Sequence, residues 1–368
     1  MEEVKRNVTE AAFLRAPLFV WWDVTNRCNF RCLHCYSRSD LDAHETKDLA
    51  LDEVKGVLNQ LSQMGVFHVY FLGGEPFARH DFMDIVRYAR SLRLGVMINS
   101  NGWFVTERIA QELRRLGVRE VRISLDGASP QTHDGFRGVR GAFARATGAV
   151  TLLKTAGLEQ VCIACTASKY NLDEVGQIVD LAANLGAYNI QVVIMGDCGT
   201  GHENYGRLAL TTEDSIRLRQ VLALKREQYL GRLLVYSVDG VLDMPCTECV
   251  QRGTIRPDFM GCRAARTACN ITHNGDVIPC LLIREPIAGS LRERTLRDIW
   301  LESGVFASWR KKHLMSPECS KCDWADVCIR ECPMSPSQLS VESDGRAGTV
   351  ARVGTRFRSQ KACVLTCV

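Results

Sequence analysis

Residues 18–238 alternate between short, β-prone apolar segments and amphipathic segments with helical periodicity. Strands are expected at 18–24, 67–72, 95–99, 120–125, 160–166 and 188–194, and helices at 51–64, 81–92, 106–116, 142–155, 172–185 and 212–229. Repeated strand–helix units predict a parallel sheet covered by helices, with right-handed crossovers. Six units are too few to close an eight-stranded barrel, so we predict an α/β fold, a partial (β/α)6 TIM-like barrel. The functional site of such a barrel lies at the C-terminal ends of its strands.

The chain has 17 cysteines in 368 residues, and eleven of them fall between Cys246 and Cys367. The segment from Met1 to Arg15 mixes acidic and basic residues and has no apolar core, so it is not a signal peptide. We therefore expect a cytoplasmic protein, in which thiols stay reduced. Clustered thiols then favour metal binding over disulfides or over inert buried cysteines.

Charge and hydropathy exclude several partners. The net charge of +4 is too small to indicate a nucleic acid, and no apolar run is long enough to span a membrane. Periodicity weakens after residue 238, where the cysteines gather. We therefore divide the chain into an N-terminal extension (1–17), the barrel (18–238) and a cysteine-rich domain (239–368), which needs metal to stabilise its small core.

Three cysteines follow the first expected strand in the pattern Cys28-x3-Cys32-x2-Cys35. Iron–sulfur clusters are normally held by four cysteines, so three leave one iron without a protein ligand. An open coordination position is typical of catalytic metal sites. Zinc is the alternative, but His34 is the only further ligand at finger spacing and it lies between two of the cysteines.

Polar motifs follow the next three expected strands. They are Gly73-Gly74-Glu75-Pro76, Ser100-Asn101, and Ser124 with Asp126, and Arg137 comes shortly after the last. Paired glycines let a backbone approach a ligand closely, and a guanidinium suits a carboxylate.

In this order and spacing, the cysteine pattern and the strand-end motifs resemble the radical S-adenosylmethionine (SAM) superfamily, with His34 at its aromatic position. The resemblance implies a 4Fe–4S cluster on Cys28, Cys32 and Cys35 whose open iron binds SAM. One electron then cleaves SAM to a 5′-deoxyadenosyl radical, which abstracts a substrate hydrogen. The resemblance also implies that Glu75 contacts the SAM ammonium and that Arg137 reaches its carboxylate. The full set implied to bind SAM is Gly73, Gly74, Glu75, Pro76, Ser100, Asn101, Ser124, Asp126 and Arg137.

The C-terminal cysteines resemble the SPASM domain of radical SAM peptide maturases, which implies two auxiliary 4Fe–4S clusters and three clusters in all. The family pattern assigns Cys262, Cys269, Cys280 and Cys332 to the first auxiliary cluster. It assigns Cys319, Cys322, Cys328 and one further cysteine to the second. That last ligand is either Cys363 or Cys367, and we take Cys363. A zinc ribbon is the alternative, but it would leave several thiols unused. Cys246 and Cys249 are extra, and we expect no role for them.

The resemblance to mycofactocin- and PqqE-type maturases favours modification of a ribosomally made precursor peptide, by crosslinking, oxidation or decarboxylation. Leu281 stands where sulfatase-maturing relatives carry an aspartate, which disfavours formylglycine formation. About 17 residues precede the first strand, so we expect a separate leader-binding protein, together with a flavodoxin- or ferredoxin-type reductant.

Two other functions remain open. One is a small-molecule radical SAM enzyme, such as a tetrapyrrole side-chain decarboxylase or a sugar-alcohol dehydrogenase. The other is a non-catalytic iron–sulfur electron carrier. A carrier has no need of the strand-end motifs that orient SAM.

Overall fold

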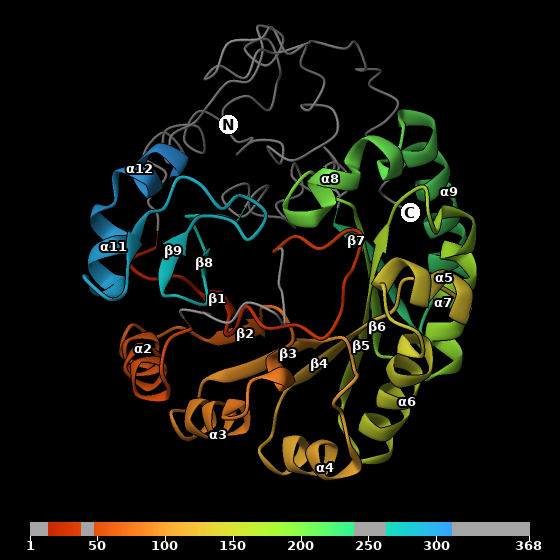
Figure 1. Cartoon of the computed structure of the whole chain (residues 1–368). Coiled ribbons are helices and arrows are strands. Elements are labelled where there is room, and N and C mark those ends of the chain that lie inside the picture. The colour runs from red at the N-terminus through yellow and green to blue at the C-terminus, as the bar shows by residue number, and fades with distance from the viewer. Residues whose placement is uncertain (1–13, 38–47, 239–262, 311–368) are drawn as a thin grey trace, which may run out of the picture.

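The computed structural model describes residues 14–37, 48–238 and 263–310. In this part of the chain one ten-stranded sheet curves into an open barrel, and helices cover its outer face (Figure 1). The strand order is β10-β9-β8-β1-β2-β3-β4-β5-β6-β7. Strands β1 to β7 are parallel, and β8 lies parallel to β1 at the other side. The predicted partial α/β barrel is therefore confirmed.

The strands are β1 (Phe19–Asp23), β2 (His68–Leu72), β3 (Gly95–Ser100), β4 (Glu120–Ser124), β5 (Gln160–Ala167), β6 (Asn189–Ile194), β7 (Leu234–Val238), β8 (Ala268–Ile271), β9 (Asp276–Ile278) and β10 (Gly289–Ser290). The α-helices are α2 (Leu51–Gln63), α3 (Phe82–Ser91), α4 (Glu107–Arg115), α5 (Pro130–Arg137), α6 (Ala142–Thr155), α7 (Val175–Asn184), α8 (Gly199–Leu208), α9 (Thr212–Gln228), α11 (Leu296–Glu302) and α12 (Gly304–Arg310). Short 3-10 turns lie at Pro76–Ala78 (η1) and Leu172–Glu174 (η2).

The main core lies between the sheet and its helices. Alternate strand residues face outward, as a pleated strand requires, so that Val69 and Phe71 of β2 are fully buried together with Trp22 of β1. The helices contribute apolar residues at intervals of three and four, such as Leu58 and Leu61 of α2. The face of the sheet that the helices do not cover therefore lines the barrel interior.

Helices α5 and α8 and strand β7 were not predicted. The signals for α5 are present, because the Ser129 side chain accepts a hydrogen bond from the backbone of Thr132, a proline follows it, and Gly138 ends the helix at φ 71°. The glycine-rich start of α8 obscured that helix. Strand β7 extends the parallel sheet by one strand beyond the six that were expected.

Strand β8 belongs to the cysteine-rich region, yet it pairs with β1 of the barrel from Phe19↔Ala268 to Trp22↔Ile271. The sheet thus continues from the barrel into residues 268–290. The proposed boundary at residue 238 stays a prediction. Among the described residues, no helix is long and apolar enough to cross a bilayer.

The core makes a stability prediction. Phe71 has no exposed surface and packs edge-on against Phe82, with ring centroids 5.6 Å apart. We expect Phe71→Ala to lower the free energy of unfolding by about 3–5 kcal/mol, since it removes a buried ring and leaves a cavity. The control is Phe67→Ala, because Phe67 lies one residue before β2 and is 63% exposed. Its effect should stay within about 0.5 kcal/mol in denaturant unfolding. Equal effects of the two variants would contradict the assigned packing.

Candidate active site

The loop after β1 carries the three clustered cysteines and is held first by the end of β2. The backbone N–H of Gly74 donates to the carbonyl of Thr25 at 2.8 Å, and that of Glu75 donates to Arg27 at 2.8 Å. These bonds place the Gly-Gly-Glu-Pro turn directly against the residue before Cys28.

Helices α5 and α8 hold the other side of the loop. The N–H of Leu33 donates to the carbonyl of Phe136 in α5 at 3.0 Å. From α8, the N–H of Gly201 donates to the Cys35 carbonyl at 3.1 Å, and the Asn204 amide donates to Leu33 at 3.0 Å. Helices α5 and α8, neither of which was predicted, therefore position the cysteine loop.

The three thiols share a largely apolar environment. Cys28 and Cys32 are buried and Cys35 is half-buried. Burial raises the pKa of Cys32 to about 11 and that of Cys28 further, and the neighbouring thiols add to the effect in both. Thiols that resist ionisation in this way become thiolates when metal replaces their protons. Within the described ranges, no three His, Cys, Asp or Glu side chains converge on a single ion site. Three cysteine thiols on one loop are a donor set that suits a 4Fe–4S cluster, in which each thiolate would bind its own iron.

The cysteine loop can pack against the end of β2 because Gly73 and Gly74 have no side chains. A Cβ at Gly74 would lie 2.0 Å from the Arg27 carbonyl oxygen and 3.0 Å from Cβ of Cys28. Gly73 has φ 133°, and a Cβ there would lie 2.3 Å from the Thr25 oxygen. Both positions thus exclude a side chain, which gives the predicted glycines a steric reason.

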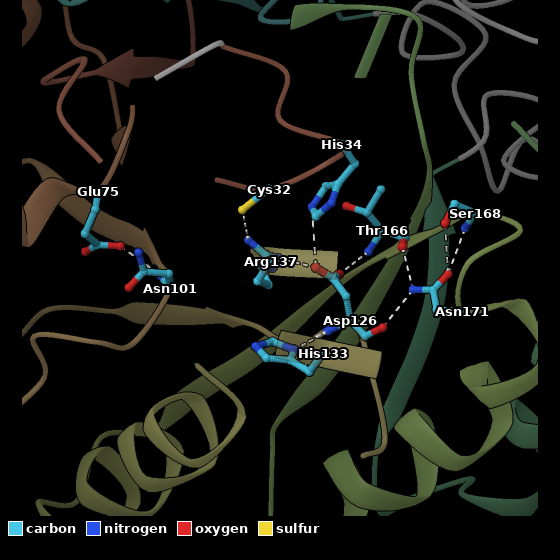
Figure 2. Close-up of polar contacts among 10 residues, drawn as sticks. All are labelled: Cys32, His34, Glu75, Asn101, Asp126, His133, Arg137, Thr166, Ser168 and Asn171. Atoms are coloured by element: carbon cyan, nitrogen blue, oxygen red, sulfur yellow. Dashed lines mark hydrogen bonds and ion pairs between the residues drawn. The ribbon is translucent and has the colours of Figure 1, made fainter. Parts of the chain in front are cut away.

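Glu75 is completely buried beside this loop (Figure 2). Its carboxylate accepts hydrogen bonds from the Asn101 N–H at 2.7 Å, the Ser100 hydroxyl at 2.8 Å and the Phe77 N–H at 3.2 Å. Burial nevertheless raises the pKa of Glu75 to about 7. The Asn101 side chain in turn donates to Asn29 of the cysteine loop at 2.8 Å. A buried carboxylate held in this way suits a ligand that brings N–H donors or positive charge.

His34 of the cysteine loop points toward Asp126, which also contacts Arg137 (Figure 2). Arg137 Nη2 lies 2.6 Å from Asp126 Oδ2, and its Nη1 donates to Cys32 Sγ at 3.8 Å. Burial by itself raises the pKa of Asp126, but Arg137, together with His34, His133 and the Thr166 N–H, outweighs it and holds that pKa below its usual range. His34 Nε2 lies 3.4 Å from Asp126 Oδ2, yet burial lowers the pKa of His34 to about 3, so the imidazole is neutral.

Further partners fix Asp126 that sequence reasoning missed. The Asp126 N–H donates to His133 Nδ1 at 3.0 Å, and the Thr166 N–H donates to Asp126 Oδ1 at 2.7 Å. The Asn171 amide donates to the Asp126 carbonyl oxygen at 2.8 Å. His133 begins the segment His-Asp-Gly-Phe-Arg-Gly that also contains Arg137, so the sequence did carry a signal for it. Asn171 follows β5 and has no comparable motif.

The remaining predicted residues divide into two groups. Pro76 begins η1 and is buried, and Ser124 is half-buried at the end of β4. Cys269 is fully buried in β8, where burial raises its pKa to about 12, and Cys280 is half-buried after β9. Cys262, Cys319, Cys322, Cys328, Cys332 and Cys363, with the alternative Cys367 and the extra Cys246 and Cys249, lie outside the described residues.

A contact from the cysteine-rich region reaches the strand ends. Arg284 Nη1 lies 2.8 Å from Asp23 Oδ2 at the end of β1, and the Tyr36 hydroxyl donates to Asp23 Oδ1 at 2.9 Å. The Arg284 guanidinium also lies over the Tyr36 ring, 5.5 Å from its centroid. The residue directly after Cys35 is thus tied to the segment that follows Cys280.

Comparison with known proteins identifies the family of the chain. The family model described as the radical SAM superfamily matches residues 22–182, and SPASM, described as an iron-sulfur cluster-binding domain, matches residues 262–323. An AdoMet-dependent heme synthase from Methanosarcina barkeri is 31% identical over 86% of this chain and 91% of that protein. The chain belongs to the radical SAM superfamily. The members of this family are enzymes that use SAM and iron–sulfur clusters.

Other relatives of this radical SAM chain carry different names. Mycofactocin maturase MftC from Mycolicibacterium smegmatis is 29% identical over 90% of this chain and 82% of that protein. PqqA peptide cyclase from Streptomyces rochei is 30% identical over 83% of this chain and 82% of that protein. SuiB of Streptococcus suis bound to S-adenosylmethionine has the same fold, with a TM-score of 0.72 and 18% identity over 90% of this chain and 77% of that one.

The close packing of Gly74 against the cysteine loop leads to a prediction about iron content. We expect Gly74→Ala to lower the iron content of the anaerobically reconstituted protein by about four atoms per chain, because its methyl group would displace the backbone before Cys28. The control is Gly148→Ala in α6, where nothing lies within 4 Å of the added atom. The Gly148→Ala variant should keep the iron content of the wild type. Both variants are compared by elemental analysis after circular dichroism has confirmed folding, and a Gly74→Ala protein with full iron would contradict the steric assignment.

Glu75 makes a pH prediction. Its pKa is raised to about 7, so the carboxylate becomes negative as pH rises through that value. If Glu75 binds the SAM amino group as the motif predicts, the negative form would accept its hydrogen bonds better. We expect SAM affinity to increase about tenfold between pH 6 and pH 8, measured by calorimetry on the reconstituted protein. Glu75→Gln should lack this increase. Because the titration of SAM itself is common to both proteins, parallel pH profiles would contradict the role of Glu75.

Proposed function

We propose that this protein reductively cleaves SAM to a 5′-deoxyadenosyl radical and uses it to modify a ribosomally made precursor peptide. The observation that carries the SAM chemistry is the meeting of the three-thiol loop with Glu75 and with the Asp126–Arg137 pair at one end of the barrel. When bound by Cys28, Cys32 and Cys35, a 4Fe–4S cluster supplies the electron and an open iron for SAM.

The chain's own residues do the binding and orienting. Gly73 and Gly74 let the backbone approach the cysteine loop, and Glu75, held by the Asn101 N–H, would accept hydrogen bonds from the SAM amino group. Arg137 puts a positive charge beside Cys32, and Asp126 holds that guanidinium in place. The buried setting of these groups excludes water, which strengthens their electrostatic effect. Ser100, Asn101, Ser124 and Pro76 complete the proposed SAM-binding set.

Support for a peptide substrate comes from the relatives. A PqqA peptide cyclase and a mycofactocin maturase each match more than four fifths of their length to this chain. A tetrapyrrole substrate is the second candidate, because a relative named AdoMet-dependent heme synthase shares 31% identity with this chain. The two candidates share the SAM site and differ only in what the radical attacks.

The proposal includes three 4Fe–4S clusters and three partners. The second and third clusters would use the cysteine sets assigned above from the SPASM pattern, of which Cys269 and Cys280 are described. The partners would be the precursor peptide, a separate leader-binding protein and a flavodoxin- or ferredoxin-type reductant, in the cytoplasm. Iron analysis tests the number of clusters, since three clusters of four correspond to about twelve irons per chain.

The test of SAM chemistry is production of 5′-deoxyadenosine. We expect the anaerobically reconstituted, dithionite-reduced protein to form it, and Cys28→Ala, Cys32→Ala and Cys35→Ala each to abolish it, because the cluster loses a ligand. The matched control is Cys165→Ala, since Cys165 is a buried thiol of β5 that belongs to the main core. Chromatography with mass detection measures the product. SAM cleavage that persists in the triple variant would refute the proposed site.

The substrate is tested separately. The reduced enzyme is incubated with a synthetic peptide encoded by a short gene beside its own, and in parallel with a tetrapyrrole that bears propionate side chains. A mass change in the peptide alone supports peptide maturation. Loss of carbon dioxide from the tetrapyrrole alone would refute peptide maturation and support the tetrapyrrole substrate instead.

A further inference from the structure

The interior face of the barrel carries a second polar cluster, formed by Glu120 and Arg122 of β4 and their partners on β6 and β7. Both side chains face the interior, because the alternate residues of β4 pack in the main core on the other face of the strand. Arg122 Nη2 lies 2.7 Å from Glu120 Oε1 and donates to the Tyr236 hydroxyl at 3.1 Å. Its Nη1 donates to the side-chain oxygen of Gln191. Glu120 and Arg122 therefore form a nearly buried ion pair inside the barrel.

The Arg122 guanidinium reaches the strand level of the proposed SAM site. Ser124 of the SAM-binding set is the register partner of Ala164. The same row continues to Gln191 and Tyr236, both of which Arg122 contacts. All four residues of the row keep partly exposed surface, whereas the outward-facing residues beside them are buried. Side chains therefore do not fill the interior at this level, and the ion pair forms its floor.

Aromatic rings line the side of the interior that β1 and β2 form. The rings of Trp21 and Tyr70 lie 6.3 Å apart, and Phe19 packs edge-on against Trp21 at 5.0 Å, measured between ring centroids. Burial raises the pKa of Tyr70, and Glu120 adds to this effect while Arg122 opposes it. The Tyr70 ring therefore lies close to the ion pair and keeps its hydroxyl proton. The interior thus combines an apolar wall with a polar floor.

The charges of this floor are balanced, because Glu120 neutralises Arg122 and the groups beside them are uncharged. Burial raises the pKa of Tyr236, and it raises that of Cys162 to about 12, although Arg122 opposes burial in both. Among the described residues, Arg122 Nε has no acceptor and Glu120 Oε1 accepts no hydrogen bond of good geometry. The floor therefore offers one donor and one acceptor without net charge.

We propose that the Glu120–Arg122 pair determines substrate specificity by receiving an uncharged group that both donates and accepts hydrogen bonds, of which the amide is the example in a peptide, in preference to a carboxylate. This inference rests on the proposed function and deepens it, because a peptide offers amides whereas the tetrapyrrole of the second candidate offers propionate carboxylates.

Electrostatics explain the preference. A carboxylate would face Glu120 as a like charge, and a buried charge that lacks its own partner is costly. An amide N–H would donate to Glu120 while the amide oxygen accepts from Arg122, and hydrogen bonds to charged groups are stronger than those between neutral groups. A buried ion pair adds little net stability compared with apolar residues, so stability alone gives no reason for one at this level.

The experiment compares two probes that share a benzene ring and differ in one group, 3-phenylpropionamide and 3-phenylpropionate. Each is titrated near neutral pH into the complete reconstituted enzyme with SAM and without reductant, and binding is followed by ligand-observed nuclear magnetic resonance. We expect the wild type to bind the amide about tenfold more tightly than the carboxylate. In Glu120→Gln the preference should reverse, because the charge of Arg122 is then uncompensated.

Two further variants keep the test specific. Glu112→Gln is the matched control, because Glu112 lies on α4 outside the barrel and pairs there with Arg115 at 2.8 Å. It should leave the amide preference unchanged. The double variant Glu120→Gln/Arg122→Gln removes both charges, so it leaves no unpaired buried charge if Glu120→Gln alone fails to fold. It should bind the amide about tenfold more weakly than the wild type does.

Several results would overturn this specificity. Equal binding of the two probes by the wild type, or no measurable binding of the amide, would do so, and tighter binding of the carboxylate would in addition favour the tetrapyrrole. An amide preference that persists in folded Glu120→Gln, or an unchanged amide affinity in the double variant, would show that the probes bind elsewhere. Failure of the proposed function is seen separately, because the dithionite-reduced wild type would then form no 5′-deoxyadenosine.

Discussion

The site depends on the backbone hydrogen bonds that hold the loop carrying Cys28, Cys32 and Cys35. This loop has no regular secondary structure of its own, so its buried N–H and carbonyl groups need partners from elsewhere. The partners are Gly74 and Glu75, directly after β2, and the helices α5 and α8, which follow β4 and β6. All three of these strands belong to the parallel sheet. Because parallel strands end at one edge, the same bonds that shape the loop bring Glu75 and Arg137 beside the thiols.

The electrostatics of the site follow from burial. Burial raises the pKa of Glu75 to about 7 and raises the pKa values of Cys28 and Cys32, so in the protein alone these two thiols favour their neutral forms. Asp126 differs, because Arg137 neutralises it at 2.6 Å. Removing either partner would leave an unpaired buried charge, which typically costs about 3–5 kcal/mol. The pair therefore gives Cys32 a fixed positive neighbour, whereas Cys28 and Cys32 lose their protons when a metal binds them.

Strong local periodicity made much of the fold predictable. Helix α6 has the predicted bounds, and β1 to β6 lie where apolar, β-prone segments indicated. Helix α8 was not predictable in the same way, because glycines disfavour helices in isolation. Here Gly199 is required, since a Cβ would lie 2.3 Å from the Cys35 oxygen. The motifs indicated Glu75 and Asp126, but the contact of Asn171 with Asp126 spans 45 residues and exists only in the folded chain.

The central claim is that the loop of Cys28, Cys32 and Cys35 holds a cluster with an open iron that SAM occupies. Electron–nuclear double resonance on the reduced enzyme, with SAM labelled by ¹⁵N at its amino group, tests this contact directly. The account predicts a nitrogen coupling to the reduced cluster, absent when Cys32 is replaced by alanine. A reduced cluster whose spectrum is the same with and without SAM, and that shows no nitrogen coupling, would contradict it.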